Sequence, residues 1–198
     1  MTIKKISDYA NISSGRSFRG AIKSSFNSTH KVVQIGDVKF EDNKVFIDFN
    51  SLVETEIKTS RKVASLECGQ ILIVAKGNDK PVLFLENVPN DVVCTQHFLV
   101  ITPKENEDVT AEFLYFYLSS DFAKSWMNSN AGGSYQSSLS KSTLEKLPFP
   151  NLSLEKQNTL LRLSESVASE INLHQKMITL RKSQLNQVLD DLLEKDND

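Results

Sequence analysis

The C-terminal stretch from Ser153 to Asp198 contains neither glycine nor proline, and it constrains the fold more than any other part of the sequence. Good helix formers dominate it, and Ser153 can serve as the N-cap. Apolar residues recur at positions 160, 163, 167, 171, 178, 185, 188 and 192. This alternation of three- and four-residue steps is typical of a coiled-coil seam. The pattern predicts one helix of about 40 residues, which at about 1.5 Å per residue extends further than a domain of this size can cover.

The seam of this helix has two core positions in the heptad. One position holds Ile171, Ile178, Leu185 and Leu192, and the other holds Leu160, Val167, His174, Arg181 and Val188. The polar members of the seam lower its stability but fix the register and orientation of a partner. We therefore expect these nine residues to form the interface of a dimeric or partner-bound coiled coil. The alternative is an ordinary surface helix that folds back on the core.

The residues before the helix favour short strands and then helices. Runs rich in β-branched and aromatic residues occur at 31–47, 69–75, 81–85 and 97–101. Helical spacing begins after Thr110, a plausible N-cap, and Pro148 and Pro150 end the region. The sequence thus predicts an α+β fold with one mixed, strand-rich domain at residues 1–150 and a long helix at 151–198.

The length of 198 residues suits one such domain with an appendage. No apolar stretch approaches the roughly 18 residues that span a bilayer, and the N-terminus lacks the features of a secretory signal, so we expect a cytoplasmic protein without membrane contact. Cys68 and Cys94 have no metal-ligand spacing, and we interpret them as buried free thiols.

No catalytic motif is present in the sequence. A phosphate-binding loop, a nucleophile elbow, an HExxH pair and the tetrapeptide with which amino-methyltransferases hold their target amine are all missing. His30, His97 and His174 stand apart from one another. We therefore expect a non-catalytic chain with no metal and no cofactor. A small hydrolase or nuclease with an unrecognised constellation is the remote alternative.

Charge is distributed unevenly along the chain, although its net value is only −2. Residues 1–31 hold six basic residues and one acidic residue, which gives +5, whereas residues 151–198 hold six basic and eight acidic residues, which gives −2. The basic part includes the segment SSGRSFRGAIKSSFNSTHK at 13–31. Arginine guanidinium groups bind phosphates and guanine edges, and short polar side chains donate to phosphates. A DNA-contacting loop and a solvated loop both fit this segment.

The order of several motifs resembles the specificity subunits of type I restriction-modification systems. The strongest similarity is GGSYQSSLSKSTLEKLPFPNLSLEKQ at 132–157, followed by a long helix that ends LRKSQLNQVLDDLL. Upstream, ISSGRSF (12–18), QIGDV (34–38), GQILIVAKG (69–77) and EFLYFYLSS (112–120) match further landmarks of a target recognition domain. Gln70 stands where that family usually has Asp, and Asn151 where a second proline is common.

The resemblance implies a half-length specificity subunit, because a full one carries two recognition domains and two spacer helices. Such a chain would pair its helix, over about residues 154–193, with a second copy as an antiparallel homodimer that reads a bipartite DNA site. Methyltransferase subunits, which bring S-adenosylmethionine, and a nuclease subunit would be its further partners.

The expected contacts to double-stranded DNA come from two loops. They are Arg16, Ser17, Arg19 and Lys23 of the basic segment and Gly132, Gly133, Ser134, Tyr135 and Gln136 of the glycine loop. Residues 1–150 hold seventeen basic and seventeen acidic residues, however. This balance keeps open an alternative, a decayed or competing half-subunit that binds methyltransferase subunits but not DNA.

Overall fold

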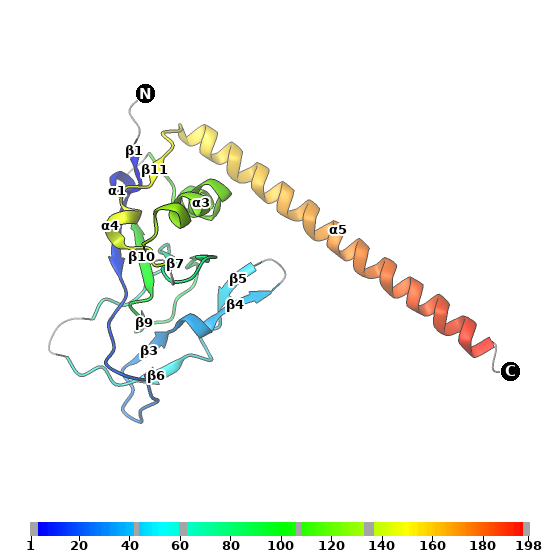
Figure 1. The fold of residues 1–198 in the computed structure, drawn as a ribbon, viewed down its shortest axis with the longest axis horizontal. Helices are drawn as coiled ribbons and strands as arrows, with labels where there is room; N and C mark the ends of the chain where they lie inside the picture. The colour runs from blue at the N-terminus through cyan, green and yellow to red at the C-terminus, as the bar shows by residue number, and fades with distance from the viewer. Residues whose placement is uncertain (1–3, 42–43, 60–62, 106–107, 133–136, 196–198) are drawn as a thin grey trace. The chain divides into compact units, whose positions relative to one another are not determined.

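The computed structural model describes residues 4–41, 44–59, 63–105, 108–132 and 137–195 (Figure 1). The chain divides into two compact units, Met1–Leu154 and Glu155–Asp198. The first is strand-rich with short helices, and the second is helical. The predicted α+β class with a long C-terminal helix is confirmed.

An antiparallel sheet of four strands forms the centre of the first unit. Its order is β2 (Ala10–Ser14), β10 (Phe98–Pro103), β7 (Ile71–Val74) and β8 (Val82–Phe84). All four side chains of β7 are buried, so this strand is covered on both faces. A continuous apolar run predicts such a strand, because alternation is lost when neither face meets water.

A second sheet lies beside the first and contains β6 (Val53–Thr55), β3 (His30–Val33) and β9 (Val92–Cys94). Strand β3 pairs antiparallel with β6 and parallel with β9. The 3-10 turn η1 (Ile35–Asp37) then leads into a hairpin of β4 (Val38–Glu41) and β5 (Lys44–Ile47). Val33, Leu72, Val92 and Phe98 belong to one buried apolar cluster, so both sheets share a single core.

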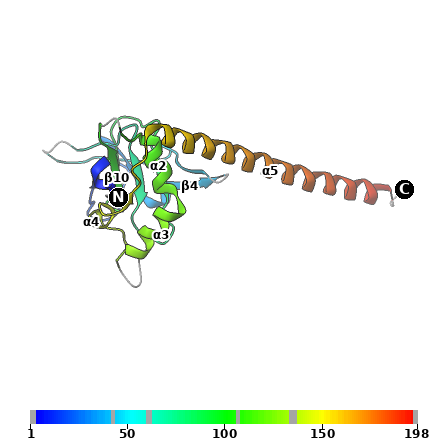
Figure 2. The same cartoon turned by 90° about the horizontal axis from the view of Figure 1, so that it is seen from above.

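The described residues of the first unit also form four α-helices: α1 (Ile6–Tyr9), α2 (Ala111–Ser119), α3 (Asp121–Asn130) and α4 (Lys141–Leu144). The predicted cap of α2 is confirmed, because the amide of Phe113 donates to Thr110 Oγ1 at 3.1 Å. Helix α2 contacts α3 (Figure 2) and packs on β8, where the rings of Tyr115 and Phe84 lie 5.6 Å apart.

The two ends of the first unit meet at a small antiparallel pair of β1 (Lys4–Lys5) and β11 (Pro148–Phe149). Phe149 is buried, and its ring lies 5.0 Å from that of Tyr9 and 4.9 Å from that of Tyr117. The Tyr117 hydroxyl donates to the Pro148 carbonyl, and burial raises the pKa of that hydroxyl to about 12. The proline-flanked Phe149 therefore closes the domain against its first strands.

The second unit consists of α5 (Leu154–Lys195), an uninterrupted helix of 42 residues. Most of its large apolar side chains are exposed, among them Ile171, Ile178, Leu185 and Leu192 of the predicted seam. The polar seam residues are exposed as well. His174 lies 3.6 Å from Glu170, and Arg181 donates to Gln184 at 3.1 Å.

The interpretation of the cysteines needs one correction. Both thiols are free, and burial raises the pKa of Cys94 to about 12, but Cys68 is exposed. Cys68 lies in the turn that precedes β7, where the chain is at the surface despite its apolar neighbours in sequence.

Candidate functional site

Gly15 sits where the N-terminal strand changes its partner. Up to Ser14 the chain pairs antiparallel with β10, and the Gly15 amide still donates to Phe98 O at 3.0 Å. The Arg16 amide then donates to Cys94 O at 2.8 Å, and Arg16 forms a parallel bridge with Thr95. A Cβ on Gly15 would lie only 2.1 Å from Thr95 O, so only glycine permits this close approach.

Arg16 begins a loop that carries the predicted basic residues. Its backbone is held on both sides, because the amide of Gln96 also donates to Arg16 O at 2.8 Å. Beyond it, Ser17, Arg19 and Lys23 are exposed on a segment without regular structure. The sheets thus fix the start of this loop and leave its cations at the surface.

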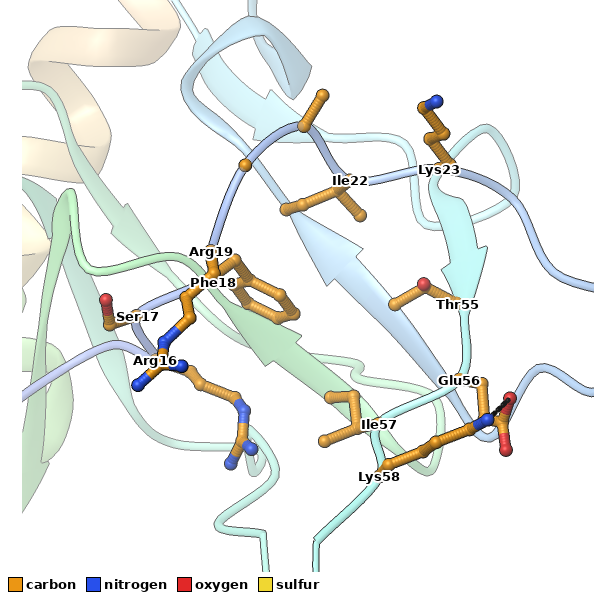
Figure 3. Close-up of a pocket in the computed structure, with 12 residues that line it drawn as sticks. Arg16, Ser17, Phe18, Arg19, Ile22, Lys23, Thr55, Glu56, Ile57 and Lys58 are labelled. Atoms are coloured by element: carbon orange, nitrogen blue, oxygen red, sulfur yellow. Dashed lines mark ion pairs between the residues drawn. The ribbon is translucent and has the colours of Figure 1, made fainter.

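The loop and the segment after β6 form two walls of a hollow of about 370 Å³ (Figure 3). The whole lining consists of residues 16–23 and 55–58. Phe18, Ile22 and Ile57 supply apolar lining between the charged side chains. We call this hollow the basic pocket. It brings together all four predicted residues of the basic segment: Arg16, Ser17, Arg19 and Lys23.

Four cations and one carboxylate line the basic pocket. Glu56 pairs with Lys58 at 3.5 Å, while the side chains of Arg16, Arg19 and Lys23 have no hydrogen-bond or ion-pair partner among the described residues. Sequence reasoning missed Lys58, because the contact between the two walls joins residues distant in sequence. The pocket offers three cations without partners, on a loop whose first residue is held by backbone hydrogen bonds. Free cations of this kind bind phosphates.

The predicted glycine loop lies elsewhere. Gly133, Ser134, Tyr135 and Gln136 fall outside the described residues, and Gly132 does not line the basic pocket. Gly132 instead exchanges two hydrogen bonds with Ser138, at 2.9 and 3.1 Å. The residues on the two sides of this loop are therefore hydrogen-bonded to each other.

Lys80 holds the base of the glycine loop and was missed from the sequence. Its side chain is only 1% exposed, and its ammonium donates to Gly77 O at 2.9 Å, Asn128 Oδ1 at 2.7 Å and Ser137 Oγ at 2.8 Å. Burial lowers the pKa of this lysine, and three neutral acceptors offset part of the cost of desolvation. Lys80 thereby joins the β7–β8 turn, α3 and the segment after the loop.

The described residues contain no group of three His, Cys, Asp or Glu side chains that could hold a metal ion. None of the helices described is both long enough and apolar enough to cross a bilayer. His97 is partly buried, and its Nδ1 has no hydrogen-bond partner in the part of the chain that the structure describes. Burial together with Lys76 lowers the pKa of this histidine.

The apolar face of α5 is wider than the predicted seam. Leu173, Met177 and Leu180 lie outside both seam positions, and each is more than half exposed. At about 100° per residue these three residues form a stripe that borders the seam on the side of His174 and Arg181. Their spacing of four and three residues is the sequence signal that identifies this stripe, which we call the outer stripe.

Residues 1–186 match the type I restriction modification DNA specificity domain. The chain belongs to this family. The match covers the strand-rich unit and most of α5, so the resemblance drawn from the motifs is confirmed. Family membership also supports the prediction that the chain is not an enzyme.

Solved structures of specificity subunits share the fold of this family member. The S subunit of a type I restriction-modification system from M. genitalium matches with a TM-score of 0.53 at 16% identity, over 88% of this chain and 42% of that one. The HsdS subunit from Thermoanaerobacter tengcongensis matches with a TM-score of 0.57 at 13% identity, over 85% and 37%. A structure of a type I R-M system, described for its complex assembly and conformational transition, gives 0.59 at 14% identity, over 93% and 42%.

The present chain therefore spans about two fifths of the length of these solved relatives. No curated protein sequence matches it.

Gln70, which departs from the usual aspartate of the family motif, is buried with both ends of its amide bonded. It donates to Thr102 Oγ1 at 3.1 Å and accepts from the Glu67 amide at 3.0 Å.

Gly15→Ala tests the close approach that places Arg16. We expect the free energy of unfolding to fall by about 1–3 kcal/mol, because the new methyl group overlaps Thr95 O. Urea unfolding measures the change, and amide exchange at Arg16 should become faster. Gly36→Ala is the matched control, because a Cβ added there would meet nothing within 4 Å beyond the adjacent residues. It should stay within about 0.5 kcal/mol of wild type. Equal stability of the two variants would contradict the assignment.

Lys80→Met tests the hydrogen bonds that hold the base of the glycine loop. The substitution keeps the apolar stem but leaves Gly77 O, Asn128 Oδ1 and Ser137 Oγ without their donor. We expect a loss of about 1–3 kcal/mol in the free energy of unfolding, measured by urea titration at neutral pH. The exposed Lys76→Met is the control and should change it by less than about 0.5 kcal/mol. A Lys80→Met variant that unfolds at the same urea concentration as the control argues against a role for these bonds.

Proposed function

We propose that the chain is a sequence-specific DNA-recognition subunit that directs the methyltransferase and nuclease subunits of a type I restriction-modification system to a bipartite site. The observation that carries this proposal is the basic pocket in a member of a DNA specificity family. Arg16, Arg19 and Lys23 are free of partners among the described residues, and backbone hydrogen bonds hold the start of their loop at Arg16. They can therefore neutralise phosphates without first breaking ion pairs within the protein.

The basic pocket suits the backbone of duplex DNA. Each phosphate that a cation neutralises releases condensed counterions, which supplies most of the sequence-independent affinity. Arg16 and Arg19 can in addition reach guanine edges with pairs of hydrogen bonds from the planar guanidinium group. Lys58 adds a further cation on the opposite wall of the pocket.

The glycine loop is the second proposed contact. Gln136 matches the donor and acceptor pattern of adenine in the major groove, and the bare backbone of Gly132 and Gly133 can approach phosphate closely. Lys80 and Ser138 fix the base of this loop, as the contacts above describe. Ser134 and Tyr135 complete the proposed set.

The long helix is proposed to form an antiparallel homodimer through its seam. The interface comprises Leu160, Val167, Ile171, His174, Ile178, Arg181, Leu185, Val188 and Leu192. Exposed apolar side chains repeated along α5 support this proposal, because their burial against a second helix removes a large apolar surface from water. Two identical recognition units related by a two-fold axis would read two inverted half-sites at a spacing set by the helices.

The outer stripe supports a further contact with methyltransferase subunits. A helix that contacts one partner buries about two seam positions per heptad, and the outer stripe lies beyond them. Leu173, Met177 and Leu180 thus remain available after the homodimer has formed. The nuclease subunit would join the assembled complex.

The balanced charge of residues 1–150 favours the second candidate function, a subunit that dimerises and binds methyltransferase subunits without DNA affinity. Salt dependence separates the two. A DNA-binding subunit loses affinity steeply as salt rises, whereas a chain without phosphate contacts shows a shallow slope with or without the methyltransferase subunit.

Replacement of Arg16 and Arg19 by alanine tests the basic pocket. We expect affinity for a mixed-sequence duplex of about 40 bp, about four helical turns, to fall about tenfold or more at moderate salt. The slope of log affinity against log salt should become shallower by about 2, one for each lost phosphate contact. Fluorescence anisotropy across a salt series measures both.

The control for this test is the double change Lys141→Ala and Lys146→Ala, which removes the same charge from exposed positions on and just after α4. It should leave the salt slope nearly unchanged. If both double variants reduce the slope equally, net charge rather than the basic pocket governs binding.

Ile178→Glu tests the seam, and Met177→Glu is its neighbouring control. These side chains are 49% and 56% exposed in the single chain, but only Ile178 is in the seam. Sedimentation equilibrium at about micromolar concentration should show a wild-type dimer and an Ile178→Glu monomer, because a charge buried in the interface without a partner is costly.

The Met177→Glu variant should stay dimeric and bind the methyltransferase subunit at least about tenfold more weakly, since it changes the outer stripe. A wild-type monomer would refute the homodimer. Loss of the dimer in both variants would show that the seam and the outer stripe are one surface.

A further inference from the structure

A turn at residues 26–27 holds a phenylalanine entirely in solvent. The side chain of Phe26 is 110% exposed, more than in an extended reference peptide, and no other apolar residue of the described chain reaches that value. Full burial of such a side chain contributes favourable free energy to folding. The fold leaves this free energy unused, although many loops can turn a phenylalanine toward a nearby core.

Hydrogen bonds to β6 and its continuation brace this turn on both sides. The Ser25 amide donates to Glu54 O at 3.1 Å, and the Thr29 amide donates to Thr55 O at 3.0 Å. The Ser28 hydroxyl donates to the Glu54 carboxylate at 3.1 Å. The phenyl ring of Phe26 is thus presented at the tip of a fixed turn.

The support of this turn is also the support of the basic pocket. Thr55 accepts a backbone hydrogen bond from Thr29, just after the turn, and lines the pocket. Lys23 of the pocket precedes Phe26 by three residues. At most about 3.6 Å per residue separates their Cα atoms, so the Cα of Phe26 lies within about 11 Å of the Cα of Lys23. A ligand bound by the free cations therefore comes within reach of the ring.

We propose that Phe26 is a wedge residue, which inserts its ring against unstacked bases of the DNA whose phosphates bind Arg16, Arg19 and Lys23. This inference rests on the proposed function and adds a structural consequence, a local opening of base stacking. Apolar wedges of this kind separate base steps and kink the duplex, and stacking on an aromatic ring recovers part of the cost. The braced turn limits the entropy lost when the ring is immobilised.

The experiment uses the 198-residue chain and a duplex of about 40 bp enriched from a randomised library by the wild-type protein. Permanganate reactivity of thymines reports unstacking, and energy transfer between dyes at the duplex ends reports bending. Phe26→Ser removes the wedge and Phe26→Leu keeps an apolar one. Thermal unfolding should be the same for all three proteins, because the ring makes no contact within the fold.

We expect wild type and Phe26→Leu to expose thymines at one step. The Phe26→Ser variant should lose that reactivity, and its binding should change the energy transfer between the duplex ends less than wild-type binding does. It should also bind about tenfold or more weakly, which is within the range for loss of one stacked base. Its salt slope should equal that of wild type, because no phosphate contact is lost.

Two outcomes overturn the inference in distinguishable ways. Failure of the wild-type chain to enrich any duplex refutes the proposed function and the wedge together. Enrichment with equal affinity, bending and thymine reactivity for wild type and Phe26→Ser refutes the wedge alone. The latter result, with weaker binding of Phe26→Ser to the methyltransferase subunit, would assign the ring to a protein contact instead.

Discussion

The change of strand partner at Gly15 is the constraint on which the placement of the candidate site depends. Before it the chain is the edge of the antiparallel sheet, and after it the chain borders β9 of the second sheet. Strand β9 in turn pairs with β3, whose other neighbour β6 leads to the far wall of the basic pocket. Both walls are thus connected by backbone hydrogen bonds through a few residues, so the sheets fix where each wall begins. One missing Cβ makes this connection possible.

The shared apolar core keeps the two sheets in this arrangement. Side chains of β3, β5, β7, β8, β9 and β10 contribute to one cluster, and Phe149 closes the opposite end with Tyr9 and Tyr117. Polar groups in this interior are few and mostly bonded, as Gln70 and Lys80 illustrate. The first unit therefore has an apolar core of its own, and the apolar stripes of α5 are exposed.

Local signals explain which parts of the structure were predictable from the sequence. The buried run Ile71–Val74, the cap at Thr110 and the long glycine-free helix depend on residues close together in the chain, and each was predicted. The parallel pairing of β3 with β9, the cation Lys58 and the buried Lys80 depend on contacts between distant segments, so periodicity and spacing could not identify them. Cys68 shows the converse error, since apolar neighbours in sequence did not place it in the core.

The segment from Ser17 to Ser28 contributes no fully buried side chain, yet both of its ends are anchored by backbone bonds at Arg16 and Thr29. Anchors made of backbone atoms do not depend on which side chains lie between them. Stability and surface chemistry are therefore separated in this part of the molecule. Side chains in this segment can therefore be replaced, or the segment exchanged for another of similar length, without removing the backbone bonds that anchor it.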